Sequence, residues 1–423
     1  MAEPGFATRS VHAGAKPDPT THARATPIYQ TTSYVFDNTD HAANLFGLKE
    51  FGNIYSRIMN PTNDVLEQRV AALEGGVAAL AVGSGHAAQH LALYTLLSPG
   101  DEIVAARQLY GGTVNQFNHA FKKFGWGVKW ADGTKPDSFK PQITSKTKAI
   151  WVESIANPGG IITDLEPIAK IAHDAGVPLI VDNTLATPYL IRPFEWGADI
   201  IVHSATKFLG GHGNSIAGVI VDSGKFNWNN GKFPTLTEPN GSYHGLKIWE
   251  TFGNISFILA TRVLGLRDLG PALSPFNAFL VLTGIETLPL RLQKHSDNAL
   301  AVARWLSNHP KVSWVNYAGL EKDASYALHK KYSPKGAGSV FTFGAKGGFE
   351  AGKKLVNSVK LFSHLANVGD TRSLIIHPAS TTHSQLSPSE LIEAGAGPDV
   401  VRLSVGIEDV ADIVADLDQG LKA

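Results

Sequence analysis

The segment HSATKFLGG contains the most chemically suggestive residue of the sequence, Lys207. A lysine that follows a buried strand can form a Schiff base with a carbonyl compound, and desolvation lowers its pKa for that task. Ser204 and Thr206 lie two residues apart, so both hydroxyls can bind one phosphate group. Gly210 and Gly211 permit a tight turn close to a ligand. A lone lysine is usually a solvated loop residue, but this context favours a reactive lysine beside a phosphate.

A second residue of this kind, Asp182, ends the apolar run PLIVD. A carboxylate at the end of a buried strand can pair with a protonated pyridine nitrogen, although an ordinary turn or capping role is an equal alternative. Gly85 and His86 belong to a Gly-Ser-Gly-His turn between a strand and a helix, where free backbone N–H groups favour an anion. The turn matches neither the dinucleotide pattern GxGxxG nor the P-loop pattern, so a plain turn is equally consistent.

Three other segments carry aromatic or cationic residues that could bind a ligand. Tyr110 precedes two glycines and could stack on a flat ring, or could be a surface tyrosine. Tyr55 and Arg57, in YSRIMNPT, offer a hydroxyl and a guanidinium suited to a phosphate, or a structural contact. Arg402, in VVRLSVG, could hold a carboxylate or form a salt bridge at a domain edge.

The elements that must position these residues alternate between strands and helices. The strands read as near-continuous apolar runs, which is typical of a mostly parallel sheet buried on both faces. This alternation predicts a three-layer α/β domain, which binds ligands at the carboxyl ends of its strands. Thr163 and Glu166 form a capping-box pattern that predicts a helix start. Strands are predicted at residues 79–82, 101–105, 150–154, 178–182, 199–203 and 216–222.

We divide the chain into three parts. Residues 1–60 are rich in Pro, Thr, Asn and Gly but carry many aromatic residues, which disordered segments usually lack. We therefore expect an N-terminal arm that packs on a neighbouring subunit. Residues 61–285 form a large α/β domain with an insertion at about 224–285, of which residues 247–284 look helical. Residues 286–423 form a smaller C-terminal α/β domain that begins with a long helix.

The composition excludes several classes of protein. Lys plus Arg and Asp plus Glu both number 37, so the chain lacks the basic surplus of a nucleic-acid or membrane-surface binder. There is no cysteine, which excludes disulfides, Cys-ligated zinc and a cysteine nucleophile. No metal-binding pattern such as HExxH occurs. Neither a signal peptide nor a membrane span is recognisable, and we expect a cytoplasmic protein.

Taken together, these motifs resemble the Cys/Met-metabolism family of pyridoxal-phosphate enzymes over nearly the whole chain. The matching segments are YSRIMNPT, SGHAA, LYGGT, ESIANP, VDNTLATP, HSATKFLGGHG, HPASTTH and RLSVGIED. The resemblance implies a fold-type I transferase whose large domain, residues 61–285, binds pyridoxal 5'-phosphate on a mostly parallel seven-stranded sheet. Within the family the chain is most similar to the O-acetylhomoserine sulfhydrylases.

The resemblance also implies a role for each matching residue. Lys207 would carry the cofactor and move protons, Asp182 would pair with the ring nitrogen, and Tyr110 would stack on the ring and assist the leaving group. Phosphate contacts would come from Gly85, His86, Ser204 and Thr206, and from Tyr55 and Arg57 of the neighbouring subunit. Asn157 would contact the ring's phenolic oxygen region and the substrate, and Arg402 with Ser373 would hold the substrate carboxylate. The family usually forms tetramers with active sites shared across dimers.

The implied reaction is a γ-replacement that converts O-acetylhomoserine and sulfide into homocysteine and acetate, a step of methionine biosynthesis. Two departures separate this reading from its alternatives. Methionine γ-lyases usually carry a cysteine where this chain has Gly112. Cystathionine-processing members such as cystathionine γ-synthase usually carry a glutamate where this chain has Arg372, and a cation there would repel the ammonium group of their substrates. The sequence leaves open the acetyl or succinyl ester and the choice between sulfide and methanethiol.

Overall fold

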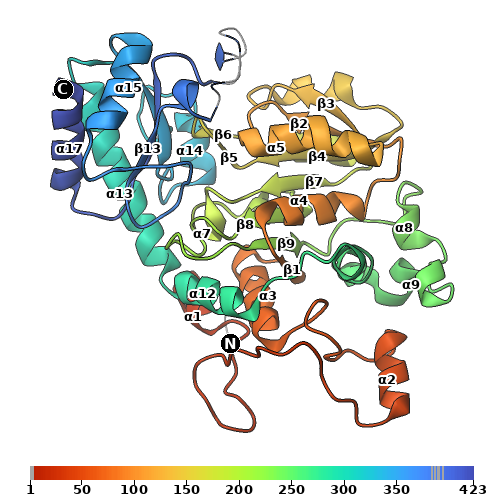
Figure 1. The fold of residues 1–423 in the computed structure, drawn as a ribbon. Coiled ribbons are helices and arrows are strands. Elements are labelled where there is room, and N and C mark those ends of the chain that lie inside the picture. Colours follow the sequence, from red (N-terminus) through yellow and green to blue (C-terminus); the bar gives the residue numbers. More distant parts are fainter. Residues whose placement is uncertain (1–3, 383, 385–386, 388–390, 393–394) are drawn as a thin grey trace.

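The computed structural model describes residues 4–382, 384, 387, 391–392 and 395–423. Its centre is a seven-stranded sheet of strand order β1-β9-β8-β7-β4-β2-β3 (Figure 1). β8, β7, β4, β2 and β3 pair in parallel, and only β9 runs antiparallel to both its neighbours, β1 and β8. The α/β class and the mostly parallel seven-stranded sheet are therefore confirmed. Its strands are β1 Ala78–Val82, β2 Glu102–Ala106, β3 Gly127–Ala131, β4 Thr147–Glu153, β7 Leu179–Asp182, β8 Ile200–Ser204 and β9 Gly218–Asp222.

Burial explains why these segments form central strands. Every residue of β2, β7 and β9 is buried, which matches their runs of aliphatic side chains and a sheet covered on both faces. The edge strand β3 is only partly buried, and its sequence GVKWA lacks an apolar run. The strand predictions above therefore missed it.

The C-terminal part of the chain builds a second, five-stranded sheet of order β10-β11-β14-β13-β12. The long helix α13 leads from the large sheet to this region, α15 packs on β11 and β14, and α17 packs on α13 and α15 (Figure 1). Its strands are β10 Val312–Asn316, β11 Val340–Ala345, β12 Ser363–His364, β13 Leu374–Ile376 and β14 Val400–Ser404. A separate two-stranded ribbon joins β5 Ile155–Ala156 to β6 Ile161–Ile162.

The α-helices vary in length from single turns to the long α13. Their bounds are α1 Phe6–His12, α2 Thr39–Phe46, α3 Pro61–Glu74, α4 Gly85–Tyr94, α5 Gly111–Asn115, α6 Leu165–Asp174, α7 Thr187–Leu190, α8 Pro234–Thr237, α9 Ile248–Phe252, α10 Ser256–Ala260, α11 Arg267–Leu269, α12 Pro275–Glu286, α13 Leu288–Ser307, α14 Tyr326–Tyr332, α15 Gly348–Ser358 and α17 Val410–Lys422. Within the described ranges, no helix is both long and apolar enough to cross a membrane.

The stretch 247–284 is largely helical, as predicted, but it is divided into several helices, and the chain turns at Gly270, whose φ of +80° suits glycine, before it restarts at Pro275. The capping-box prediction differs from the structure, because Thr163 does not cap α6, whose N-cap residue is Asp164. The Thr163 hydroxyl instead donates to the carbonyl oxygen of Glu153 at 2.6 Å, because β4 lies within its reach.

Candidate active site

A cavity of about 270 Å³ opens at the carboxyl ends of β4, β7 and β8. Most of the residues predicted from the sequence line it, namely Gly85, His86, Tyr110, Asn157, Asp182, Ser204, Thr206, Lys207 and Arg402. Tyr55, Arg57 and Ser373 do not. A larger cavity of about 590 Å³ lies under the N-terminal arm, but it contains no lysine. We therefore take the smaller cavity as the candidate active site.

Two sets of residues, distant in sequence, contribute to this cavity's lining. We call Asp182, Ser204 and Lys207, which come from the ends of β7 and β8 and the loop after β8, the sheet wall. We call Asn367 and Arg402, which come from the loop before β13 and from β14, the C-terminal wall. The two walls meet where the Lys207 ammonium donates a hydrogen bond to Asn367 Oδ1.

Lys207 lies in a mostly buried position. Burial lowers the pKa of its amine, and the neighbouring guanidinium of Arg402 lowers it further. A lowered pKa increases the fraction of neutral amine, which is the form that attacks a carbonyl carbon. Gly369, with φ of +77°, brings its loop so close that an added Cβ would lie 2.8 Å from the Phe208 nitrogen. This glycine therefore allows the Asn367 loop to reach the lysine.

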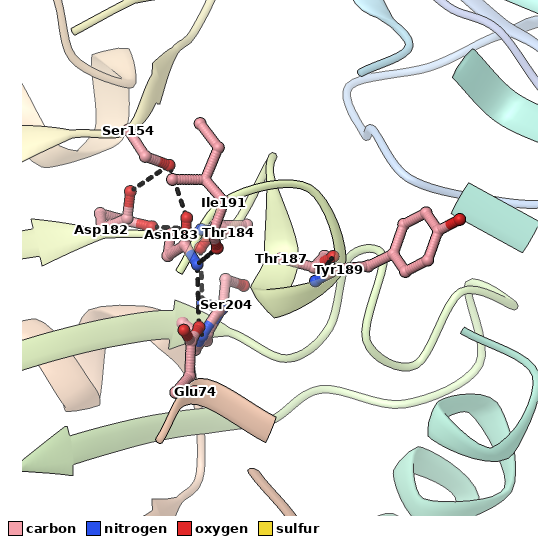
Figure 2. Close-up of polar contacts among 10 residues, drawn as sticks. Glu74, Ser154, Asp182, Asn183, Thr184, Thr187, Tyr189, Ile191 and Ser204 are labelled. Atoms are coloured by element: carbon pink, nitrogen blue, oxygen red, sulfur yellow. Dashed lines mark hydrogen bonds and ion pairs between the residues drawn. The ribbon is translucent and has the colours of Figure 1, made fainter. Parts of the chain in front are cut away.

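Asp182 stands at the end of β7 with its carboxylate held from two sides. Oδ1 accepts the Thr184 N–H at 3.0 Å, and Oδ2 lies 3.5 Å from Gln89 Nε2. Thr184 also accepts the Ser204 N–H at 2.8 Å, which ties β7 to β8 (Figure 2). Burial raises the pKa of Asp182, while the contacts from Thr184 oppose that rise. A cationic ring nitrogen at this carboxylate would offset the cost of burying it.

Below Asp182 a chain of buried polar residues anchors the end of β7. Ser154 Oγ donates to Asn183 Oδ1 at 2.7 Å, and Asn183 Nδ2 donates to Glu74 Oε1 at 2.8 Å (Figure 2). The same Glu74 oxygen lies 2.6 Å from His203 Nε2. This network links α3, β7 and β8, so it fixes the strand ends that carry the sheet wall.

The start of α4 lies in the cavity lining and is suited to bind an anion. Ser84 caps the helix by accepting the Ala87 N–H, while the N–H groups of Gly85 and His86 belong to a first turn with no carbonyl partner inside the helix. A Cβ on Gly85 would lie 2.7 Å from the Ser204 Cβ, so only glycine fits there. The Thr206 hydroxyl lies in the same lining and contacts the Ala217 backbone at 3.0 Å.

Arg402 is held by two loops. Its Nη1 donates to Asn157 Oδ1 and its Nη2 donates to the Asn367 carbonyl oxygen, each at 3.2 Å. Burial lowers the pKa of Arg402 to about 10, so the side chain remains a cation at neutral pH. A half-buried guanidinium whose hydrogen bonds here go to neutral oxygen atoms is well suited to an incoming carboxylate.

The structure does not bring Ser373 to this position. Ser373 is fully buried, its hydroxyl donates to Glu408 Oε2 at 2.9 Å, and it accepts the Gly406 N–H at 2.9 Å. Asn367, six residues earlier, lies in the cavity instead. The sequence analysis missed Asn367 because the loop that carries it has no periodicity from which its direction could be read.

Tyr110 stands at the cavity mouth, where its side chain is 47% exposed. Its ring lies edge-on to His86, with the ring centroids 6.0 Å apart. A Cβ on Gly112 would lie 2.4 Å from the Tyr110 ring, so the glycine at this position leaves room for the tyrosine. The ring is therefore free to cover a flat ligand.

Three other residues named from the sequence lie away from the cavity. Tyr55 is 41% exposed, and Arg57 donates to the Arg267 carbonyl oxygen. The Arg372 side chain is 70% exposed and lies 3.6 Å from Asp370. Arg372 does not line this chain's own cavity, so its effect on substrate choice stays a prediction.

The cavity fits pyridoxal phosphate in three independent respects. It contains an amine with a lowered pKa at Lys207, a carboxylate at Asp182 for the ring nitrogen, and a helix start at Gly85 and His86 for the phosphate. These groups come from different elements yet line one space, so they can hold the cofactor's aldehyde, ring nitrogen and phosphate together.

Comparison with known proteins agrees with this reading. The family model described as "Cys/Met metabolism PLP-dependent enzyme" matches residues 7–422. O-acetyl-L-homoserine sulfhydrylase of Leptospira meyeri is 56% identical, with 98% of this chain and 96% of that protein covered. O-acetyl-L-homoserine sulfhydrylase 1 of Thermus thermophilus is also 56% identical, with coverage of 98% and 99%.

A solved structure from Campylobacter jejuni is similar as well. It is 42% identical, has a TM-score of 0.96, covers 99% of this chain and 100% of its own, and carries N'-pyridoxyl-lysine-5'-monophosphate. Family model, sequence relatives and structure all extend over almost the full chain. The chain belongs to the Cys/Met metabolism family of PLP-dependent enzymes.

Proposed function

We propose that this chain, with pyridoxal phosphate as its cofactor, converts O-acetylhomoserine and sulfide into homocysteine and acetate. In this exchange the C–O bond at the γ-carbon breaks, acetate leaves, and a C–S bond forms at the same carbon. The observation that carries the proposal is the single cavity in which Lys207, Asp182 and Arg402 meet, in a chain 56% identical to named sulfhydrylases. The cofactor supplies an electron sink for negative charge at the substrate's α-carbon.

The residues of the cavity have distinct tasks in this reaction. Arg402 binds the substrate carboxylate, with Asn157 and Asn367 fixing the guanidinium. This contact places the α-carbon on the side of Lys207, whose amine removes and returns protons when it is not bonded to the cofactor. Tyr110 covers the mouth, where it limits access of water and lies close to the leaving acetate.

The test is product analysis with the cofactor-loaded protein and O-acetylhomoserine, in separate reactions with sulfide, with cysteine and without an acceptor. We expect homocysteine from sulfide and little cystathionine from cysteine. Cystathionine as the main product would favour a cystathionine γ-synthase activity. A 2-oxoacid formed without any acceptor would favour a γ-lyase.

Parallel reactions with O-succinylhomoserine and O-acetylserine define the substrate. O-acetylserine is included because a relative named Homocysteine/cysteine synthase, from Saccharomyces cerevisiae, is 48% identical to this chain. The match covers 99% of this chain and 97% of that protein. We expect O-acetylhomoserine to be the best of the three substrates. A higher kcat/KM for either alternative would overturn the choice of ester.

We further propose that the active site is completed by a second copy of the chain within a cytoplasmic homotetramer. Two features support this assembly. Tyr55 and Arg57 lie outside their own chain's cavity. The arm that carries them also exposes Val35 at 97%, Phe46 at 60% and Phe51 at 65%, which is a large apolar surface for a free monomer.

A complementation experiment tests the shared site. Lys207→Ala and Arg57→Ala chains are each expected to be inactive or nearly so. In a mixed dimer one site receives both intact residues, so co-expression should restore about a quarter of wild-type activity for random pairing. No recovery in mixed oligomers, or a monomer by light scattering with full activity, would overturn the proposal.

A further inference from the structure

Glu153 is a buried carboxylate in the cavity lining that none of the tasks above uses. It ends β4, is 4% exposed, and binds two backbone groups from different loops. Oε1 accepts the Tyr110 N–H at 2.6 Å, and Oε2 accepts the Asn157 N–H at 2.9 Å. Each carboxylate oxygen therefore holds one residue of the active site.

Burying an ionised carboxyl group at this position is energetically unfavourable. Glu153 is paired in register with Asp182 on the adjacent strand, so two buried carboxyl groups lie side by side. Burial and the charge of Asp182 raise the pKa of Glu153, and the N–H groups of Tyr110 and Asn157 oppose that rise. A neutral residue would avoid the repulsion, but glutamine has only one acceptor oxygen and would turn an NH₂ group toward one of the two donors.

The contacts of Glu153 extend to both ends of the cavity. Asn157 in turn contacts Arg402, because its Oδ1 accepts a hydrogen bond from Arg402 Nη1 at 3.2 Å. Tyr110 carries the ring that covers the mouth. The backbone of Glu153 is itself fixed, because Thr163 Oγ1 donates to its carbonyl oxygen at 2.6 Å. One side chain thus binds the backbone of both Tyr110 and Asn157, and Asn157 in turn contacts Arg402.

We infer that Glu153 is a positioning residue. By binding the backbone N–H groups of Tyr110 and Asn157, it fixes both residues relative to the sheet wall and so sets the geometry in which the substrate reacts. The inference rests on the proposed function for its kinetic part, but the positioning of Tyr110 beside the bound cofactor does not depend on the substrate. Glu153 does not touch the reacting atoms and acts only through these two loops.

The experiment compares Glu153→Gln with Glu102→Gln in the cofactor-loaded enzyme. Glu102 is a matched control because it is also buried and lies at the opposite end of the same sheet, where it accepts the Thr144 hydroxyl. For Glu153→Gln we expect kcat/KM for O-acetylhomoserine to fall by about 10–100-fold, with a higher KM for the ester and an unchanged KM for sulfide. For Glu102→Gln we expect less than a twofold change.

A spectroscopic readout separates positioning from general stability. Visible circular dichroism of the bound cofactor reports the asymmetry of its surroundings, and we expect its amplitude to change in Glu153→Gln but not in Glu102→Gln. If Glu153→Gln fails to fold, Glu153→Asp keeps two acceptor oxygens on a shorter stem, and we expect it to show the same changes at a smaller size.

The outcomes are distinct. Wild-type kinetics and wild-type dichroism in a folded Glu153→Gln enzyme would overturn the inference, as would equal changes in the Glu102→Gln control. If the wild-type protein instead forms no homocysteine, the proposed function fails, while the dichroism of the two variants still decides the role of Glu153.

Discussion

The two walls of the active site are built in different ways. The sheet wall comes from strand ends and their following turns, so Asp182 and Lys207 are fixed by contacts within neighbouring strands and loops. The C-terminal wall comes from a loop and a strand about 160 and 195 residues farther along the chain, and its position depends on how the second sheet lies against the first. In the proposed reaction, the sheet wall therefore supplies the reacting groups, whereas the C-terminal wall orients the substrate.

The largest effect is expected at the centre of the sheet wall. Lys207→Ala removes the amine that bonds to the cofactor and moves protons, so turnover should fall by at least about 10³-fold. The fold should persist, because within the described residues the Lys207 side chain loses a single hydrogen bond, the one to Asn367. Steady-state assays and far-ultraviolet circular dichroism check both parts, and a variant with near-wild-type turnover would refute the assignment.

A smaller effect, confined to substrate binding, is expected at the C-terminal wall. Arg402→Lys keeps a cation but loses the planar fork that Asn157 and Asn367 hold, so KM for O-acetylhomoserine should rise by about 10–100-fold. Affinity for pyridoxal phosphate should change little. Fluorescence titration of the cofactor serves as the control, and an unchanged KM would show that the carboxylate binds elsewhere.

Removing the hydrogen bond between Lys207 and Asn367, which joins the two walls, should lower activity by a smaller factor. Asn367→Ala removes the acceptor for the Lys207 amine but leaves the backbone carbonyl that binds Arg402, so kcat should fall by up to about tenfold with little change in KM. Ser373→Ala is the matched comparison. Because the Ser373 hydroxyl binds Glu408 and Gly406 outside the cavity, we expect its loss to lower thermal stability and leave KM unchanged. The opposite pattern would restore Ser373 as the substrate contact.

The smallest effect is a shift in pH dependence. Arg402 is the second cause, after burial, of the lowered pKa of Lys207. Removing that positive charge in Arg402→Ala favours the protonated amine, so the pKa of Lys207 should rise while burial still keeps it below the ordinary value. The rate at which the cofactor-free protein takes up pyridoxal phosphate should then reach its plateau at higher pH than in the wild type. A profile that does not move would show that the two walls are electrostatically independent.

Much of the sheet wall was predictable from the sequence, because its signals are local. An apolar run marks each buried strand, and the polar residue that ends it must lie at the carboxyl edge where ligands bind. This rule selected Asp182 and drew attention to the loop after β8 that carries Lys207, and both residues line the cavity. Glu153 ends β4 in the same manner, so its signal was present in the segment IWVES, although the strand prediction there placed no function on it.

The same reasoning failed where tertiary contacts outweigh local pattern. Thr163 and Glu166 have the spacing of a capping box, but they do not bind each other. The Thr163 hydroxyl donates to the Glu153 carbonyl oxygen, and the Glu166 N–H donates to the Tyr332 hydroxyl. The edge strand β3 was missed because an edge position tolerates the partly buried sequence GVKWA.

The sequence by itself determined the α/β class and the family and singled out Lys207 and Asp182, which line one cavity, because strand periodicity and ordered motifs are local properties of the chain. Only the tertiary structure decided that Asn367 contacts Lys207, that Ser373 binds Glu408 outside the cavity, and that one Glu153 carboxylate holds two loops. It also placed Arg372 away from its own chain's cavity. The physical reason is that a side chain on an irregular loop points where long-range packing directs it, and no spacing in the sequence encodes that direction.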